Sequence, residues 1–135
     1  MLITILLLQD IILADESPLQ VLHESGRDAK SKSYEWLYRT GSSSKQPIVI
    51  YEYRETRGHE HPKAFLGGYK GYLCCDGYQA YQKLPPDDIT VVGCFSHARR
   101  YWEKAYNALP NDQRDGSSAE RGLVYCNLLF AFEDE

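Results

Sequence analysis

Hydrophobic residues along this chain fall into short runs with the alternation of β-strands and longer runs with the spacing of α-helices. Strands are predicted at residues 11–22, 34–39, 47–53, 71–75 and 89–95, and helices at residues 62–66, 78–84, 97–109 and 122–132. The first three strands follow one another through polar loops, which predicts an antiparallel meander. The last two strands flank a predicted helix, and a strand–helix–strand unit makes its strands parallel neighbours. These patterns predict an α/β protein with a mixed sheet.

Two acidic residues lie where apolar strand patterns end or turn. Asp15 follows four apolar residues, and Asp76 follows strand 71–75 and precedes a glycine. An acid at the tip of a strand can present its carboxylate to a metal or a substrate without burying an unpaired charge. The alternative for either acid, taken alone, is an ordinary turn or cap residue. Pro18 cannot donate to a sheet ladder, so we expect a bulge, a turn or an edge position there.

Composition narrows the class of protein. The 135 residues are enough for one domain, and 43% hydrophobic with 25% charged residues is a globular balance. The net charge is −4, and from Asp112 onward six acidic residues face two basic ones, so the preceding residues are neutral overall. Tight non-specific binding to nucleic acid through bulk charge is therefore excluded, and any contact with DNA must come from local basic patches.

The four cysteines and the first residues of the chain indicate the cellular compartment in which the protein is expected. Buried reduced thiols in a cytoplasmic protein are the expected state of Cys74, Cys75, Cys94 and Cys126. The apolar run at residues 1–8 has no basic lead-in and is far shorter than the roughly 20 residues that span a bilayer, so no membrane partner is expected. This run is typical of a start inside a longer parent sequence.

Four segments, in this order, resemble the catalytic domain of DDE transposases of the insertion-sequence-66 type. They are residues 13–22, 36–39, 71–81 and 93–100, the last two carrying the Asp-Gly-Tyr and Cys-x-x-His-Ala-Arg-Arg sequences. The resemblance covers nearly the whole chain. It implies a ribonuclease-H-like mixed sheet of three antiparallel strands then two parallel strands, with packing helices. Residues 1–110 would be an incomplete catalytic domain, and residues 111–135 a polar linker and the start of a further helix with an acidic end.

By this resemblance, Asp15 and Asp76 are the first two acids of a metal-binding catalytic triad, and the activity is DNA transposition by phosphoryl transfer. Two divalent cations can activate a water or a 3′-hydroxyl and stabilise the leaving oxygen of a phosphodiester. Mg²⁺ (or Mn²⁺) prefers carboxylate oxygens and keeps several waters, so few protein ligands suffice. The implied partners are the DNA of the transposon ends and other transposase subunits.

One departure from the family pattern concerns the third acid. In the family it lies in an Asn-Asn-x-Ala-Glu-Arg type motif, which this sequence does not contain. Glu133 could be offered as a substitute, but the resemblance places it on the helix before that motif. We therefore expect a truncated core that is inactive alone. The alternative is a non-catalytic ribonuclease-H-like remnant with weak DNA or protein binding.

Other residues suggest further chemistry. Cys94 and His97 have the spacing of two zinc ligands, although a closed site needs four. Four residues of helix 97–109 are expected to contact DNA, with support from basic residues of the charged loop 54–63: His97, Arg99, Arg100 and Lys104. For His97 and Arg100 the resemblance favours a functional role near the active site. The alternative is a solvated helix face on which Arg99 pairs with Glu103. A thiol redox role for Cys74 and Cys75 is disfavoured, because an apolar strand does not provide an exposed thiolate of low pKa.

Overall fold

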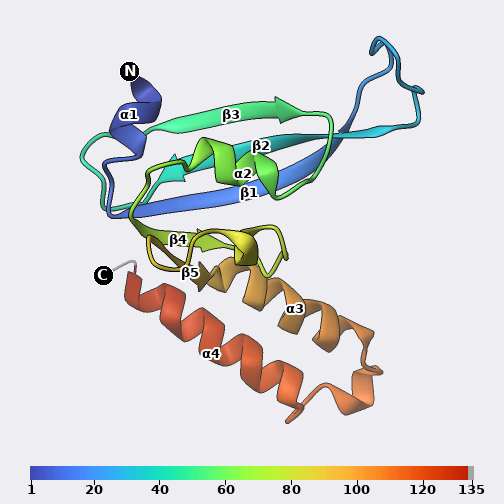
Figure 1. Ribbon diagram of the computed structural model, residues 1–135. Helices are drawn as coiled ribbons and strands as arrows, with labels where there is room; N and C mark the ends of the chain where they lie inside the picture. Colours follow the sequence, from blue (N-terminus) through green and yellow to red (C-terminus); the bar gives the residue numbers. More distant parts are fainter. Residues whose placement is uncertain (134–135) are drawn as a thin grey trace. The chain divides into compact units, whose positions relative to one another are not determined.

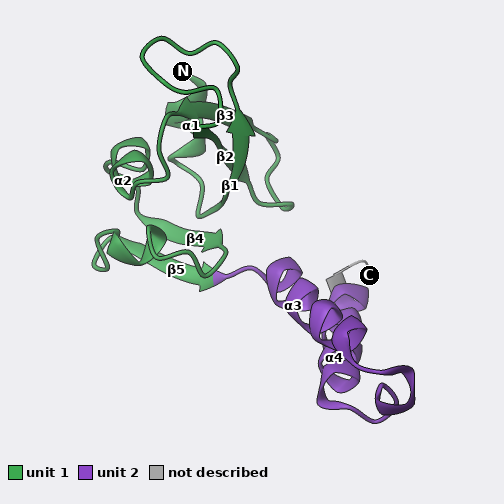
Figure 2. Ribbon diagram, turned by 90° about the vertical axis from the view of Figure 1, so that its right-hand side faces the viewer, with its two compact units in different colours: residues 1–92 green, residues 93–135 purple. Residues whose placement is uncertain are grey.

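The computed structural model describes residues 1–133 of the chain, which divides after Val92 into two compact units (Figure 2). The first unit contains a sheet and short helices: α1 (Leu2–Leu6), β1 (Ile11–Gln20), β2 (Lys32–Thr40), β3 (Val49–Arg54), α2 (Glu60–Phe65), β4 (Gly71–Cys75), η1 (Tyr81–Lys83) and β5 (Ile89–Gly93). The second unit contains α3 (Phe95–Ala108), η2 (Asn111–Gln113) and α4 (Ser118–Glu133). All five predicted strands are confirmed, with shifted ends. None of the helices within residues 1–133 is long and apolar enough to cross a membrane.

The five strands form one mixed sheet in the order β3-β2-β1-β4-β5 (Figure 1). The pairs β1–β2 and β2–β3 are antiparallel, and β1–β4 is parallel. A hydrogen bond of 3.1 Å from the Gly71 N–H to the Asp88 carbonyl joins the starts of β4 and β5, so these strands also run in one direction. The sequence predicts three antiparallel strands followed by two parallel strands in chain order. The observed order differs, because β4 pairs with β1 and not with β3. A parallel pair needs a crossover connection, and the segment that contains α2 supplies it.

One face of the sheet is the hydrophobic core. On β1 the side chains of Ile12, Ala14 and Glu16 are buried, whereas their neighbours in sequence are more exposed, as expected for a strand with side chains on alternate faces. The rings of Trp36 and Tyr38 on β2 lie on the same face, because their positions pair with those of Glu16 and Ala14. The helices α1 and α2 contribute further apolar side chains to this core. The core therefore forms on the face of β1 that Asp15 does not occupy.

Some predicted elements differ from the structure. The predicted helix 78–84 is only a 3₁₀ turn, Tyr81–Lys83, since Pro85 and Pro86 leave too few residues for an α-helix. Helix α3 begins at Phe95, earlier than predicted, and its N-cap is Cys94 without a side-chain cap bond. Ser96, a residue type that often caps helices, lies inside the first turn instead.

The second unit is a hairpin of α3 and α4. A side chain at Gly122 of α4 would collide with the indole of Trp102 on α3, so the two helices approach each other closely there. The described residues of α3 include no buried one, and Tyr101 and Trp102 are exposed by 67% and 40%. The apolar positions of helix 97–109 recur at i, i+3, i+4 and i+7, which predicts a stripe that faces a core. This prediction is wrong, because two helices alone bury only a narrow line of contact.

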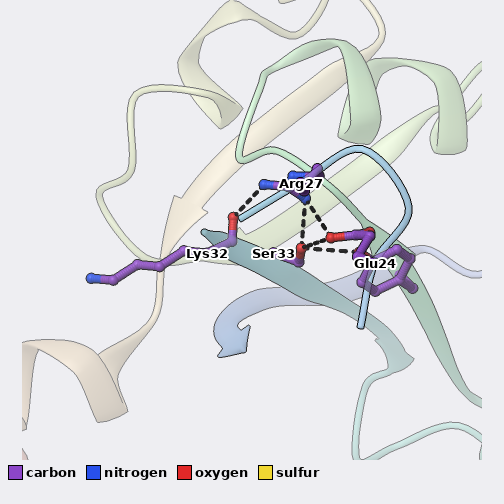
Figure 3. Close-up of polar contacts among 5 residues, drawn as sticks. Glu24, Arg27, Lys32 and Ser33 are labelled. Carbon is purple, nitrogen blue, oxygen red and sulfur yellow. Dashed lines mark hydrogen bonds and ion pairs between the residues drawn. The ribbon is translucent and has the colours of Figure 1, made fainter. Parts of the chain in front are cut away.

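A polar cluster holds the loop between β1 and β2 against the sheet (Figure 3). The buried Ser33 hydroxyl lies 2.7 Å from the Arg27 Nη1 and 3.1 Å from the Glu24 carboxylate. Arg27 also donates to Glu24 (3.0 Å) and to the Lys32 carbonyl (3.1 Å). The Tyr53 hydroxyl on β3 donates to the other oxygen of Glu24. The loop is thus joined to both β2 and β3 by side chains.

Candidate metal-binding site

Asp15 and Asp76 lie on neighbouring parallel strands. The register of β1 and β4 pairs Ile11 with Tyr72, Ile12 with Leu73 and Leu13 with Cys74. Two more residues along each strand bring Asp15 level with Asp76, the residue directly after β4. Both side chains are partly exposed. The sheet thus brings together the two acids that the sequence singles out.

Local backbone bonds orient both carboxylates. The Glu16 N–H donates to the Asp15 Oδ1 at 3.0 Å. After β4, the Tyr78 N–H donates to the Asp76 Oδ1 at 2.9 Å, which closes an Asx turn over Gly77. This turn is the local reason why the chain reverses immediately after the strand. Asp76 is therefore both a turn residue, as in the alternative interpretation, and a carboxylate presented at the strand end.

Beside this pair lies a buried carboxylate that sequence reasoning missed. The side chain of Glu16 is only 1% exposed. It accepts hydrogen bonds from the Arg57 Nε (2.8 Å) and the Tyr81 hydroxyl (2.6 Å), and it forms an ion pair with the Arg57 Nη2. The alternation of the strand could have identified Glu16, since Ile12, Ala14 and Glu16 share the inward face. An acid at an inward position needs a buried partner.

The charges of these groups act on one another. Burial raises the pKa of Glu16, and the nearby charge of Asp76 acts in the same direction, while the bonds from Tyr81 and Arg57 and the charge of Arg57 oppose it. The net pKa of Glu16 is above its usual value of 4.5. Burial and the bond to Glu16 likewise raise the pKa of the Tyr81 hydroxyl, so it stays a donor. Glu16, Arg57 and Asp76 therefore belong to one electrostatic environment.

Arg57 also contacts the turn that carries Asp76. Its guanidinium carbon lies 3.7 Å from the centroid of the Tyr78 ring, a cation–π contact. The Tyr78 hydroxyl donates to the Arg57 backbone carbonyl at 2.7 Å. Tyr78 packs edge-on against Tyr81, with ring centroids 6.3 Å apart. The loop that contains Arg57 is thus fixed to both acid-bearing segments.

The donor set at this place is two aspartates. Among residues 1–133 no group of three or more His, Cys, Asp and Glu side chains is arranged to hold a metal ion. The acids Asp134 and Glu135 lie outside the described residues, and the side chain of Glu133 is not described. Two carboxylates on adjacent strands, both open to solvent, fit a hard cation such as Mg²⁺, which takes one or two carboxylates and completes its shell with water.

Cys94 and His97 lie together at the start of α3. Burial raises the pKa of the Cys94 thiol, but hydrogen bonds from the His97 side chain and from the backbone of His97 and Ser96 outweigh it and lower the pKa. All four cysteines are free thiols, but only Cys75 and Cys126 are buried as predicted, whereas Cys74 and Cys94 are partly exposed. In the described part of the chain no third and fourth metal ligand joins this pair. The structure therefore shows a polarised thiol at this position.

The predicted DNA-binding residues all belong to the second unit. The Arg99 guanidinium donates to the Asn127 side chain on α4 at 2.8 Å and lies 3.5 Å from the Glu103 carboxylate. The i, i+4 pair of Arg99 and Glu103 is thus confirmed. Arg100 and Lys104 are exposed on α3, and His97 is partly buried. Arg100 and Lys104 therefore present their charges to solvent, whereas Arg99 also joins the two helices.

Comparison with known proteins gives one family. The family model described as "Transposase IS66 family" matches residues 1–135. A curated relative, "Uncharacterized protein y4qI" of Sinorhizobium fredii (strain NBRC 101917 / NGR234), is 31% identical over an alignment of 136 positions that covers 92% of this chain and 24% of the relative. The chain therefore spans about a quarter of the length of that relative. No solved structure matches the chain.

Proposed function

The chain belongs to the IS66 transposase family, and from this premise we propose that it forms part of a DDE-type catalytic core in which Asp15 and Asp76 hold a divalent cation for phosphoryl transfer on DNA. The observation that carries the proposal is the register of β1 and β4, in which the last described pair is Leu13 with Cys74, so that Asp15 and Asp76 each follow two residues beyond it. Ligand groups gather at the carboxyl ends of parallel strands in α/β proteins, and Asp76 occupies such an end.

The proposed chemistry divides between the metal and the chain. A bound divalent cation would activate the attacking water or 3′-hydroxyl and stabilise the leaving oxygen. The chain supplies the two carboxylates, each oriented by a backbone N–H bond, and keeps them apart from the apolar core. Mg²⁺ or Mn²⁺ suits this donor set, since both accept carboxylate oxygen.

The fold that we propose is ribonuclease-H-like. Support comes from the antiparallel meander of β3, β2 and β1, extended by β4 and β5 in parallel, with α2 in the crossover. In this arrangement β1 is central and carries the first acid, and β4 beside it carries the second. The proposal accounts for why acids 61 positions apart in sequence are neighbours in the sheet.

Two carboxylates among the described residues support binding of a metal but not a complete triad. We propose that the chain alone binds the cation without joining or cutting DNA, and that a third acid comes from elsewhere in the assembled transposase. The residues that would bind the DNA of the transposon ends are His97, Arg99, Arg100 and Lys104. A non-catalytic remnant with weak DNA binding is the second candidate, and the two-acid donor set favours it for the isolated chain.

Binding of Mn²⁺ to the purified chain tests the metal role. Titration followed by the electron paramagnetic resonance of free Mn²⁺ should show one saturable site, and Asp76→Asn and Asp15→Asn should each abolish it. Asp112→Asn removes the same charge from an exposed acid of the second unit and should leave binding unchanged. Absence of binding by the wild-type chain, or equal binding by Asp76→Asn, would overturn the proposal.

DNA binding is tested separately. Arg100→Ala should weaken binding to duplex DNA and reduce the dependence of affinity on salt by about one counterion. An unchanged affinity and salt slope would remove Arg100 from the DNA contact, whatever the metal experiment shows. A chain that cleaves DNA with Mg²⁺ on its own would contradict the proposed inactivity.

A further inference from the structure

We propose that Arg57 is a positioning residue that sets the distance between Asp15 and Asp76, and so the affinity of the site for a divalent cation. The inference rests on the metal role proposed for the two acids. It comes from a continuous series of contacts that begins at Asp15, passes through Arg57 and ends at Asp76. All of its members belong to the first unit.

The first half of this series of contacts joins Arg57 to Asp15. The Glu16 N–H holds the Asp15 carboxylate at 3.0 Å, so the backbone at Glu16 fixes one metal ligand. The Glu16 side chain passes to the other face of the sheet, where the Arg57 guanidinium and the Tyr81 hydroxyl bind it. Because this carboxylate is 1% exposed, loss of its cationic partner leaves a buried charge that must move or take up a proton.

The second half joins Arg57 to Asp76. The Arg57 guanidinium covers the Tyr78 ring at 3.7 Å, and the Tyr78 hydroxyl donates back to the Arg57 carbonyl at 2.7 Å. The Tyr78 N–H holds the Asp76 carboxylate at 2.9 Å. Tyr78 is therefore bound from three directions, and the Asx turn that orients Asp76 cannot shift without breaking these contacts.

The chemistry of the arginine suits both tasks at once. Its Nε and Nη2 both donate to one oxygen of Glu16, Oε1, and its flat face stacks on an aromatic ring. A lysine would supply the charge without the two-point geometry. These contacts of the guanidinium therefore predict that lysine at position 57 does not restore the function of arginine.

The sign of the effect separates positioning from simple charge. Arg57 carries a positive charge close to two acids, and a cation bound there would be repelled by it. Removal of that charge alone should strengthen cation binding. Loss of the positioning contacts should weaken it, because partners that orient metal ligands typically contribute 10-fold to 100-fold to affinity.

The test compares Mn²⁺ binding by Arg57→Gln with binding by the wild-type chain. We expect affinity to fall about tenfold in Arg57→Gln and also to fall in Arg57→Lys. Arg54→Gln is the matched control, since Arg54 forms a 2.5 Å ion pair with Glu52 on β3 and its loss removes the same charge. Thermal unfolding of each variant, followed by circular dichroism, confirms that binding is measured on folded protein.

Each outcome has a defined meaning. Wild-type binding with equal or tighter binding by Arg57→Gln would overturn the positioning role and leave the proposed function intact. Full affinity in Arg57→Lys would show that charge suffices and would also overturn it. Lack of binding by the wild-type chain would overturn the proposed function itself. If Arg57→Gln does not fold, Tyr78→Phe, which loses one hydrogen bond, should still reduce Mn²⁺ affinity relative to the wild-type chain, and an unchanged affinity would contradict the proposal.

Discussion

The rings of Tyr38 and Phe65 lie stacked in parallel, with centroids 3.7 Å apart and planes inclined by 6°. Tyr38 belongs to β2 and Phe65 ends α2, so the stack fixes the crossover helix to the sheet. The Tyr38 hydroxyl is buried and finds no hydrogen-bond partner within residues 1–133. Burial accordingly raises the pKa of this phenol far above its usual range.

Replacement of Tyr38 by Phe should stabilise the protein. The substitution keeps the stacked ring and removes an unsatisfied buried hydroxyl, whose desolvation costs about 1–3 kcal/mol. We expect the free energy of unfolding in urea to rise by about 1 kcal/mol. The matched control is Tyr69→Phe, because the Tyr69 hydroxyl donates to the Tyr72 carbonyl at 2.9 Å and its loss should destabilise. Equal destabilisation by both substitutions would contradict this prediction.

The start of β4 has no room for a side chain at Gly71. A Cβ there would lie 2.6 Å from the Tyr69 hydroxyl and 2.7 Å from the Asp10 carbonyl. We expect Gly71→Ala to lower the free energy of unfolding by about 1–3 kcal/mol, the usual cost of overpacking. At Gly93 a Cβ would meet no atom of the described residues within 4 Å, so Gly93→Ala serves as the control. Urea unfolding of both variants measures the difference, and similar stabilities would show that β4 can shift.

The Glu24 cluster predicts a dependence of stability on pH. The hydrogen bond from Tyr53 lowers the pKa of Glu24 below its usual value of 4.5, with help from Ser33 and Arg27. The folded state therefore favours the ionised carboxylate, and this contribution is present above the unfolded pKa and lost as pH falls through the folded one. Melting temperatures between pH 7 and pH 3 should fall more steeply for the wild-type chain than for Glu24→Gln. Parallel curves would exclude the effect.

The lowered pKa of Cys94 predicts selective alkylation. At pH 7 a larger fraction of this thiol is ionised than of an ordinary thiol, so iodoacetamide should modify Cys94 before the buried Cys126. His97→Ala removes the side-chain bond that lowers the pKa of Cys94 and should slow its reaction, because a larger fraction of the thiol is then protonated. Mass spectrometry of the digested protein measures both rates. Cys74, also partly exposed, should keep its rate in the variant and serves as the internal control.

The parts of the fold that the sequence predicts best depend on local patterns. Alternation at Ile12, Ala14 and Glu16 marks a strand with one buried face, and the apolar run before Asp76 marks another. The pairing of those two strands with each other is not a local feature: the pattern predicts strand 89–95 as the parallel neighbour of β4, and the structure also places β4 beside β1. The local patterns therefore identify both acids but not their setting, since Asp15 lies inside β1 whereas Asp76 directly follows β4.

The remaining features depend on contacts that no local pattern contains. Arg57 and Glu16 are 41 positions apart, and nothing around either residue identifies the other as its partner. Helix α3 has the periodicity of a core helix, yet Tyr101 is exposed, since periodicity reports an apolar stripe without reporting what covers it. The Asx turn at Asp76, by contrast, is predicted by a local pattern, because an Asp before Gly is a common turn signal.

Strand β1 extends well beyond its parallel neighbour. It has ten residues, and the described pairing with β4 involves only residues 11–13, so its second half has β2 on one side and is an edge strand on the other. Pro18 lies in that half. Its ring nitrogen carries no hydrogen, so another polypeptide cannot continue the ladder at this point. A proline is one of the features by which natural sheets limit the pairing of an open edge with another chain, and Pro18 lies on the open edge of β1.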